Sequence, residues 1–165
     1  AEFLKNNKEI LRVNISKKNK KKSKNLDKII KNENDKKIFE KIKKLNNFRK
    51  NYLSNFKKLI NKFSNKNNTI YALSAAPRGC VLLNSANFSK KEIHMVGEVS
   101  NSFKINKYIP GTDIIIKNEN RIIKDQPDFV IILAWHLKER IIKNLVKNGN
   151  KGKFIIPLPK LKISI

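Results

Sequence analysis

Polar and charged residues follow three predicted buried strands, at the positions where α/β proteins hold ligands. The segments read SAAPRG (Ser74–Gly79), GEVSNS (Gly97–Ser102) and AWHL (Ala134–Leu137). Ligands of open α/β sheets bind beyond the carboxyl ends of the strands, so these three segments are candidates for one site. Each of them has a chemical interpretation and a structural alternative.

The segment Ser74–Gly79 predicts an anion site. Its backbone amides begin a predicted helix, and a helix N-terminus favours negative charge. Arg78 can add a two-point contact to a phosphate group. The alternative is a plain turn between a strand and a helix, with Arg78 in solvent.

The other two segments suit contacts to a nucleotide. An acid after the second strand of such folds often accepts a ribose hydroxyl, and Glu98 is the candidate. The alternative for Glu98 is a solvated loop. Trp135 can stack on a base or form the wall of a pocket. His136 can be a general base, a hydrogen-bond donor or a helix cap.

Residue patterns of an independent enzyme are absent from the sequence. One cysteine and two distant histidines, His94 and His136, do not form a metal-binding pattern. The sequence has no phosphate-binding P-loop, no zinc-protease motif and no nucleophile elbow. It also lacks the glycine-rich, acid-following loop of an S-adenosylmethionine site. We therefore predict no catalytic residue, no metal site and no cofactor in this chain.

The elements that position these segments alternate between strand and helix. Runs such as FVIILAW are apolar on both faces, as in the central strands of a parallel sheet covered on two sides. The pattern predicts a three-layer, Rossmann-like α/β fold with a mostly parallel sheet over residues 69–165. Predicted strands cover Ile70–Ser74, Ile93–Val96, Ile114–Ile116, Phe129–Ala134 and Phe154–Ile156, and helices fall near Cys80–Ala86, Glu119–Lys124 and Leu137–Lys147.

Residues 1–68 are predicted to form an extension that differs from residues 69–165 in its composition and residue pattern. Glu9–Ser16 alternates apolar and polar residues like a half-buried strand, and the lysine-rich Lys17–Asn25 is predicted to be a solvated loop. A long amphipathic helix then runs from Asp35, its predicted N-cap, to about Asn65. Its apolar stripe needs a partner, either the domain that follows or a missing neighbour.

The chain carries a formal net charge of +25. This charge favours polyanion binding, and a nucleic-acid-binding module built on the basic residues 17–66 is the alternative function. We favour the alternative explanation, a compositional bias towards Lys, Asn and Ile that would produce the charge without any role in binding. The single cysteine, Cys80, fits a reducing cytoplasm. No apolar run is long enough for a transmembrane helix, and we predict no membrane partner.

Four motifs in this order resemble the C-terminal domain of the sugar C-methyltransferase family. They read ALSAAPRGCVLLN, KYIPGTDIII, QPDFVIILAWHLKERII and GKFIIPLPKLKI. The resemblance covers Thr69 to Ile165 well, and NNKEILRVNISKK extends it towards the N-terminus. It implies a protein that uses S-adenosylmethionine to methylate a carbon of a nucleotide-linked deoxysugar, often a dTDP-sugar.

In this family, the methyl-donor loop and the catalytic residues lie in a methyltransferase domain that precedes this one. The start at Ala1 then indicates a fragment, with that domain in cis or in trans as its partner. The resemblance assigns the nucleotide-sugar half of the active site to this chain. The residues placed by its motifs are Ser74, Ala75, Arg78, Gly79, Asn84, Tyr108, Pro110, Gly111, Thr112, Trp135 and His136.

The sequence departs from the family pattern mainly at the predicted ligand contacts. Ala72 and Ser74 replace two glycines of the first motif, and Cys80-Val81 replaces an Asn-Thr pair. Arg78 replaces a lysine and keeps the positive charge. A structural domain without a ligand, whose long helix docks onto a methyltransferase, is therefore a third interpretation.

Overall fold

The computed structural model describes residues 2–4, 7–12, 17, 24–33 and 37–164. The chain divides into two compact units, Ala1–Arg49 and Lys50–Ile165. The helix α2, Lys37–Ser64, contributes its first half to one unit and its second half to the other. Each unit is described by itself below.

The first unit contains a short hairpin and two helical segments. Strands β1 (Glu2–Leu4) and β2 (Asn7–Arg12) pair in antiparallel fashion. The predicted strand Glu9–Ser16 is thus present as far as Arg12, and its remaining residues lie outside the described ranges.

Helix α1 spans Lys24–Glu33 and was not predicted. It includes the last two residues of the predicted loop Lys17–Asn25; of the others, only Lys17 is described. The long helix was predicted from Asp35, a residue outside the described ranges, to about Asn65. The structure places α2 within this span.

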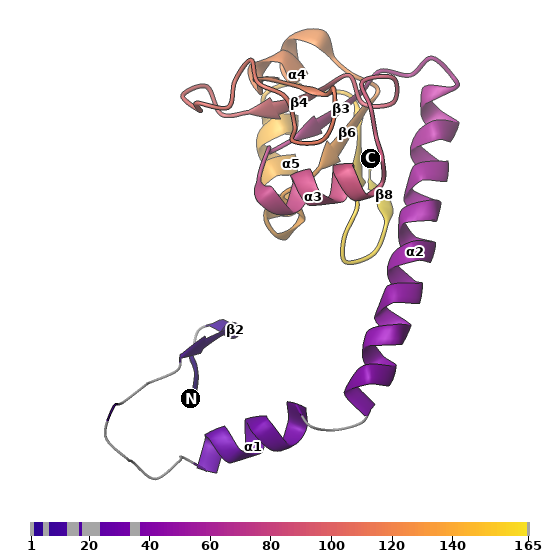
Figure 1. The fold of residues 1–165 in the computed structure, drawn as a ribbon. Coiled ribbons are helices and arrows are strands. Elements are labelled where there is room, and N and C mark those ends of the chain that lie inside the picture. The colour runs from indigo at the N-terminus through magenta and orange to yellow at the C-terminus, as the bar shows by residue number, and fades with distance from the viewer. Residues whose placement is uncertain (1, 5–6, 13–16, 18–23, 34–36, 165) are drawn as a thin grey trace. The chain divides into compact units, whose positions relative to one another are not determined.

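The second unit is built on a six-stranded sheet in the order β5-β4-β3-β6-β7-β8 (Figure 1). The first five strands are parallel, and β8 is antiparallel to β7. Their bounds are β3 Ile70–Leu73, β4 Met95–Glu98, β5 Ile115–Asn118, β6 Phe129–Ile132, β7 Lys153–Ile156 and β8 Lys162–Ser164. The helices are α3 Pro77–Ser85, α4 Asn120–Asp125 and α5 Lys138–Lys147, with a 3-10 turn, η1, at Trp135–Leu137.

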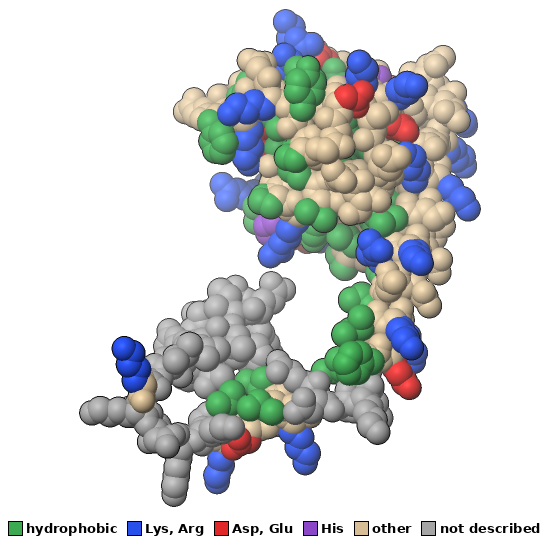
Figure 2. Space-filling model, in the orientation of Figure 1, with side chains coloured by type: hydrophobic (Ala, Val, Ile, Leu, Met, Phe, Trp, Pro, Cys, Tyr) green, Lys and Arg blue, Asp and Glu red, His purple; other side chains and the backbone are tan. Residues whose placement is uncertain are grey.

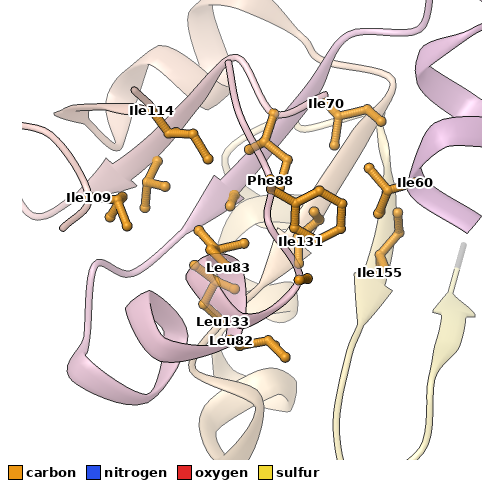
Figure 3. Packing of buried hydrophobic residues seen from close by; sticks show 14 of the residues in the cluster. Ile60, Ile70, Leu82, Leu83, Phe88, Ile109, Ile114, Ile131, Leu133 and Ile155 are labelled. Carbon is orange, nitrogen blue, oxygen red and sulfur yellow. The ribbon is translucent and has the colours of Figure 1, made fainter. Parts of the chain in front are cut away.

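The core of this unit lies on both faces of the sheet, because alternate residues of a strand point to opposite sides. On one face, Ile70 and Ala72 of β3 pack with Leu83 of α3 and with the second half of α2. Figure 3 shows this cluster, in which Ile60 of α2 lies near Ile155 of β7. On the other face, Tyr71 and Leu73 pack with residues of α4 and α5. The predicted three-layer, mostly parallel α/β fold is therefore confirmed.

The second half of α2 belongs to the core because its apolar stripe is buried. Phe56 and Ile60 are fully buried, and Phe63 stacks on Phe129 with ring centroids 4.1 Å apart. The Tyr52 hydroxyl donates a hydrogen bond to the carbonyl oxygen of Pro157. These contacts join the helix to the sheet.

The predicted elements of this unit are all present, with ends that differ by up to three residues. The sequence pattern missed β8, whose KIS segment is too short to give a periodic signal. No helix in the part of the chain that the structure describes combines the length and apolar character needed to cross a membrane.

Candidate functional site

The sheet changes its winding direction between β3 and β6. Strand β3 leads into α3 on one face, and β6 leads into α5 on the other. The two strands pair directly, with Leu73 opposite Ile132. The carboxyl ends of such a pair form the crevice where α/β proteins bind ligands.

The turn after β3 is held in one conformation by its backbone and its packing. Ser74 has a φ of +78°, in the left-handed region that favours glycine. Its amide donates a hydrogen bond to the carbonyl oxygen of Gly97, 2.8 Å away, at the end of β4. Gly79 is buried, and a Cβ atom there would lie 2.8 Å from the Leu133 Cβ. The glycine thus lets α3 approach the sheet, a packing role that the predicted ligand role did not include.

Glu98, the predicted ribose ligand, joins the turn to its surroundings. Its Oε2 accepts a hydrogen bond from the Ala75 amide at 2.9 Å, and its Oε1 accepts one from the Val99 amide at 3.1 Å. The Lys104 ammonium lies 3.7 Å from the carboxylate and donates to the Ala75 carbonyl oxygen at 2.9 Å. With 12% of its side chain exposed, Glu98 holds the turn in place, and its contact with a ribose stays a prediction.

Burial raises the pKa of the neighbouring Glu119 carboxyl group, and the charge of Glu98 raises it further. The Glu119 amide donates a hydrogen bond to the Glu98 carbonyl oxygen at 2.8 Å. The backbone of Glu119 is thus joined to the same edge of the sheet that the Glu98 side chain holds.

The second motif forms a loop that lies along α3. Tyr108 pairs with Ile115, and Gly111 has a φ of +76°. Asn84 of α3 donates a side-chain hydrogen bond to the Pro110 carbonyl oxygen at 3.0 Å. The Thr112 hydroxyl donates to the Ile109 carbonyl oxygen within the loop. Asn84, Gly111 and Thr112 therefore shape the loop that presents Tyr108.

A cavity of about 500 Å³ lies between α3 and this loop. Three of the predicted site residues, Ala75, Tyr108 and Pro110, line it. Most other lining groups are apolar, and two lysines stand among them. The remaining lining residues are Pro77, Cys80, Val81, Phe103, Lys104, Lys107 and Ile116.

The other predicted residues lie around this cavity or at the end of β6. Arg78 is exposed in the first turn of α3. Trp135 packs partly buried against the core in η1, directly after the carboxyl end of β6, and His136 is exposed beside it. The structure thus brings Ala75, Tyr108 and Arg78 to one end of α3.

Sequence reasoning missed the side chains that give the cavity its character. Phe103 is 79% exposed, and the Lys107 ammonium lies 5.2 Å from its ring centroid. A lysine within about 6 Å of an aromatic face gains a cation–π attraction. The sequence feature that could have indicated these residues is the segment NSFKINKY, in which an aromatic residue and two lysines precede Tyr108 at short spacing.

Cys80, the single cysteine of the chain, lies in the wall of the cavity. It is partly buried, and burial raises the pKa of its thiol. Its position makes it a chemical reporter for occupancy of the cavity.

The residues at the carboxyl ends of β3 and β4 do not fit S-adenosylmethionine. The turn after β3 has Ser74 and Ala75 in place of a glycine-rich loop, and the Glu98 carboxylate already accepts two backbone amides. Within the described ranges, no cluster of three or more His, Cys, Asp or Glu side chains could hold a metal ion.

Comparison with known proteins identifies the family of this chain. Residues 10–159 match the family described as "C-methyltransferase C-terminal domain". Over 98 residues the chain is 29% identical to C-methyltransferase NovU of Streptomyces niveus, which covers 58% of this chain and 23% of that protein. The chain thus spans about a quarter of its curated relative. The match covers most of the sequence, and the chain belongs to the C-methyltransferase C-terminal domain family.

Proposed function

We propose that this chain is the nucleotide-sugar-binding part of an S-adenosylmethionine-dependent C-methyltransferase acting on a nucleotide-linked deoxysugar. A domain outside this chain would hold the methyl donor and the catalytic residues. Support comes from the family, whose members transfer methyl groups to carbon, and from the poor fit of this chain's own turn to the donor. Binding the sugar here would contribute through proximity and orientation.

The observation that carries the proposal is the cavity between α3 and the Tyr108 loop. Val81, Phe103 and Tyr108 offer apolar and aromatic surface for a base. Lys104 and Lys107 supply positive charge for a diphosphate, and exposed Arg78 stands close by in the first turn of α3. An apolar wall with a few cations is the chemistry that a nucleoside diphosphate requires.

Labelling of Cys80 tests this proposal. A dTDP-sugar that fills the cavity should slow the reaction of the thiol with a maleimide, and calorimetry should give a matching dissociation constant. Lys107→Met should weaken binding by about tenfold, the loss of one charge-assisted contact. Lys147→Met, an exposed lysine in the last turn of α5, is the matched control.

A panel of dTDP-, UDP- and GDP-linked sugars covers the alternatives for the base. If no member of the panel protects Cys80 or releases heat at millimolar concentration, the binding role is wrong. If Lys147→Met reduces the affinity as much as Lys107→Met does, the ligand binds outside this cavity.

A further inference from the structure

The first half of α2 carries large apolar side chains at its surface (Figure 2). Phe39, Ile42 and Leu45 are 71%, 56% and 65% exposed. They follow one another at steps of three residues, so they form a ridge along one side of the helix. Three exposed side chains of this size on adjacent turns mark an interaction surface.

Helical spacing shows what kind of surface this ridge is. The apolar residues of α2 continue at steps of three and four into Phe56 and Ile60, which are fully buried against the sheet of their own unit. A ridge that repeats every three to four residues is typical of packing between a helix and another protein element. The exposed half of α2 therefore has the pattern of a protein-packing face.

Two cations stand within this ridge. Lys41 and Arg49 lie four residues before and after Leu45, and residues four apart on a helix are neighbours on the same face. Both are exposed. Among the described residues, Arg49 donates one side-chain hydrogen bond, from Nη2 to the Asn46 Oδ1. Glu40, the one acid in residues 37–49, is five residues from Leu45 and lies off this face.

We propose that the ridge formed by Phe39, Ile42 and Leu45 docks an amphipathic helix of a partner protein with acidic flanks. Its apolar side chains would cover the ridge, and its Asp or Glu carboxylates would pair with Lys41 and Arg49. The charge pattern selects this occupant. A second copy of the chain would bring its own cations against these two, and like charges across a helix pair disfavour pairing.

The same two cations argue against a lipid surface. A helix that lies in a membrane interface presents a broad apolar face with its lysines at the edges. Here Lys41 and Arg49 share the face with Leu45, so burial of the ridge in acyl chains would bury both charges. A carboxylate of a protein partner can meet each of them directly.

A synthetic three-heptad helix tests this inference, with Leu at the two core positions of each heptad and Glu at the flanking positions. Fluorescence anisotropy of the labelled peptide against the full chain should show binding that weakens with salt. A matched peptide with Lys at the flanking positions should not bind.

Variants of the exposed residues locate the surface without affecting folding. Leu45→Ser should weaken binding of the acidic peptide by about tenfold or more. The double variant with Lys41→Glu and Arg49→Glu should weaken it by a similar factor. Asn47→Ser and Lys58→Glu, at exposed positions of α2 outside the ridge, are the matched controls and should retain the wild-type affinity. Circular dichroism melts should be the same for all four variants.

Any of four results would overturn the inference. The acidic peptide does not bind, or it binds the Leu45→Ser variant as well as it binds wild type. Sedimentation finds a dimer of the chain that Leu45→Ser dissociates, which makes a second copy the occupant. Vesicles of phosphatidylserine and phosphatidylcholine capture wild type but not Leu45→Ser, which makes a membrane the occupant.

Discussion

Ser74 holds a backbone conformation that its side chain disfavours. Its φ of +78° places the Cβ close to its own backbone, and this costs an L-residue about 1–2 kcal/mol relative to glycine. The hydroxyl has no hydrogen bond in the described part of the chain that would offset this cost. The resemblance gave a glycine at this position, and the positive φ is the physical reason for it.

Ser74→Gly is therefore expected to stabilise the fold. The relief of backbone strain exceeds the extra entropy that glycine brings to the unfolded chain, for a net gain of about 0.5–1 kcal/mol. In urea unfolding, the variant should have a higher midpoint concentration of urea. The slope of the free energy of unfolding against urea concentration should not change. Ser74→Ala keeps the strained Cβ and should change stability little. A lower midpoint for Ser74→Gly would contradict the account.

At the scale of elements, Asn84 connects α3 to the loop that carries Tyr108. Asn84→Ala removes the hydrogen bond to the Pro110 carbonyl oxygen, at a cost of about 1 kcal/mol. The amides of Ile109 and Ile114 should then exchange with solvent faster, because the loop opens more often. Ser85→Ala, at the neighbouring exposed position, is the control. Unchanged exchange in Asn84→Ala would mean that packing alone holds the loop.

The second half of α2 is joined to the sheet by Tyr52. Burial raises the pKa of the Tyr52 hydroxyl to about 12, from the ordinary 10.0. The folded state therefore holds this proton more tightly than the unfolded chain does. The stabilisation is complete below pH 10 and is lost as the pH rises towards 12.

Tyr52→Phe tests this linkage. At neutral pH the variant should be less stable by about 1 kcal/mol, since the Pro157 carbonyl oxygen loses its donor. Between pH 10 and pH 12, wild type should lose stability more steeply than the variant. Both proteins carry the same lysines, so subtraction of the two profiles leaves the contribution of Tyr52. Parallel profiles would show that the hydroxyl ionises as it does in the unfolded chain.

The sequence predicted β3 to β7 but not β8, because each of these five strands is a run of apolar residues of strand length. FVIILAW gave β6, and the apolar stripe gave α2 within two residues of its ends. It did not predict Phe103 or Lys107 as site residues, because their segment belongs to no regular helix or strand and gives no periodic pattern. It also could not show that Gly79 meets Leu133, since that contact is set by how α3 crosses the sheet.

At the scale of the molecule, the buried clusters divide unevenly between the two units. Every residue of both core clusters, with the partly buried residues packed on them, lies at position 52 or beyond. The unit Lys50–Ile165 therefore contains an α/β core of its own, with the second half of α2 as part of it. The charge of +25 is spread over both units and does not depend on this core.

Truncation tests this division. A fragment of residues 50–165 should unfold in one cooperative transition, with a melting temperature within a few degrees of the full chain. A fragment of residues 65–165 should not, because it loses Phe56 and Ile60, and each fully buried side chain of this size contributes about 1.5–3 kcal/mol. It also leaves the Phe129 ring without Phe63. Such losses approach the whole stability of a small domain. If residues 50–165 instead fail to fold while the full chain is stable, the first unit contributes contacts that the core depends on.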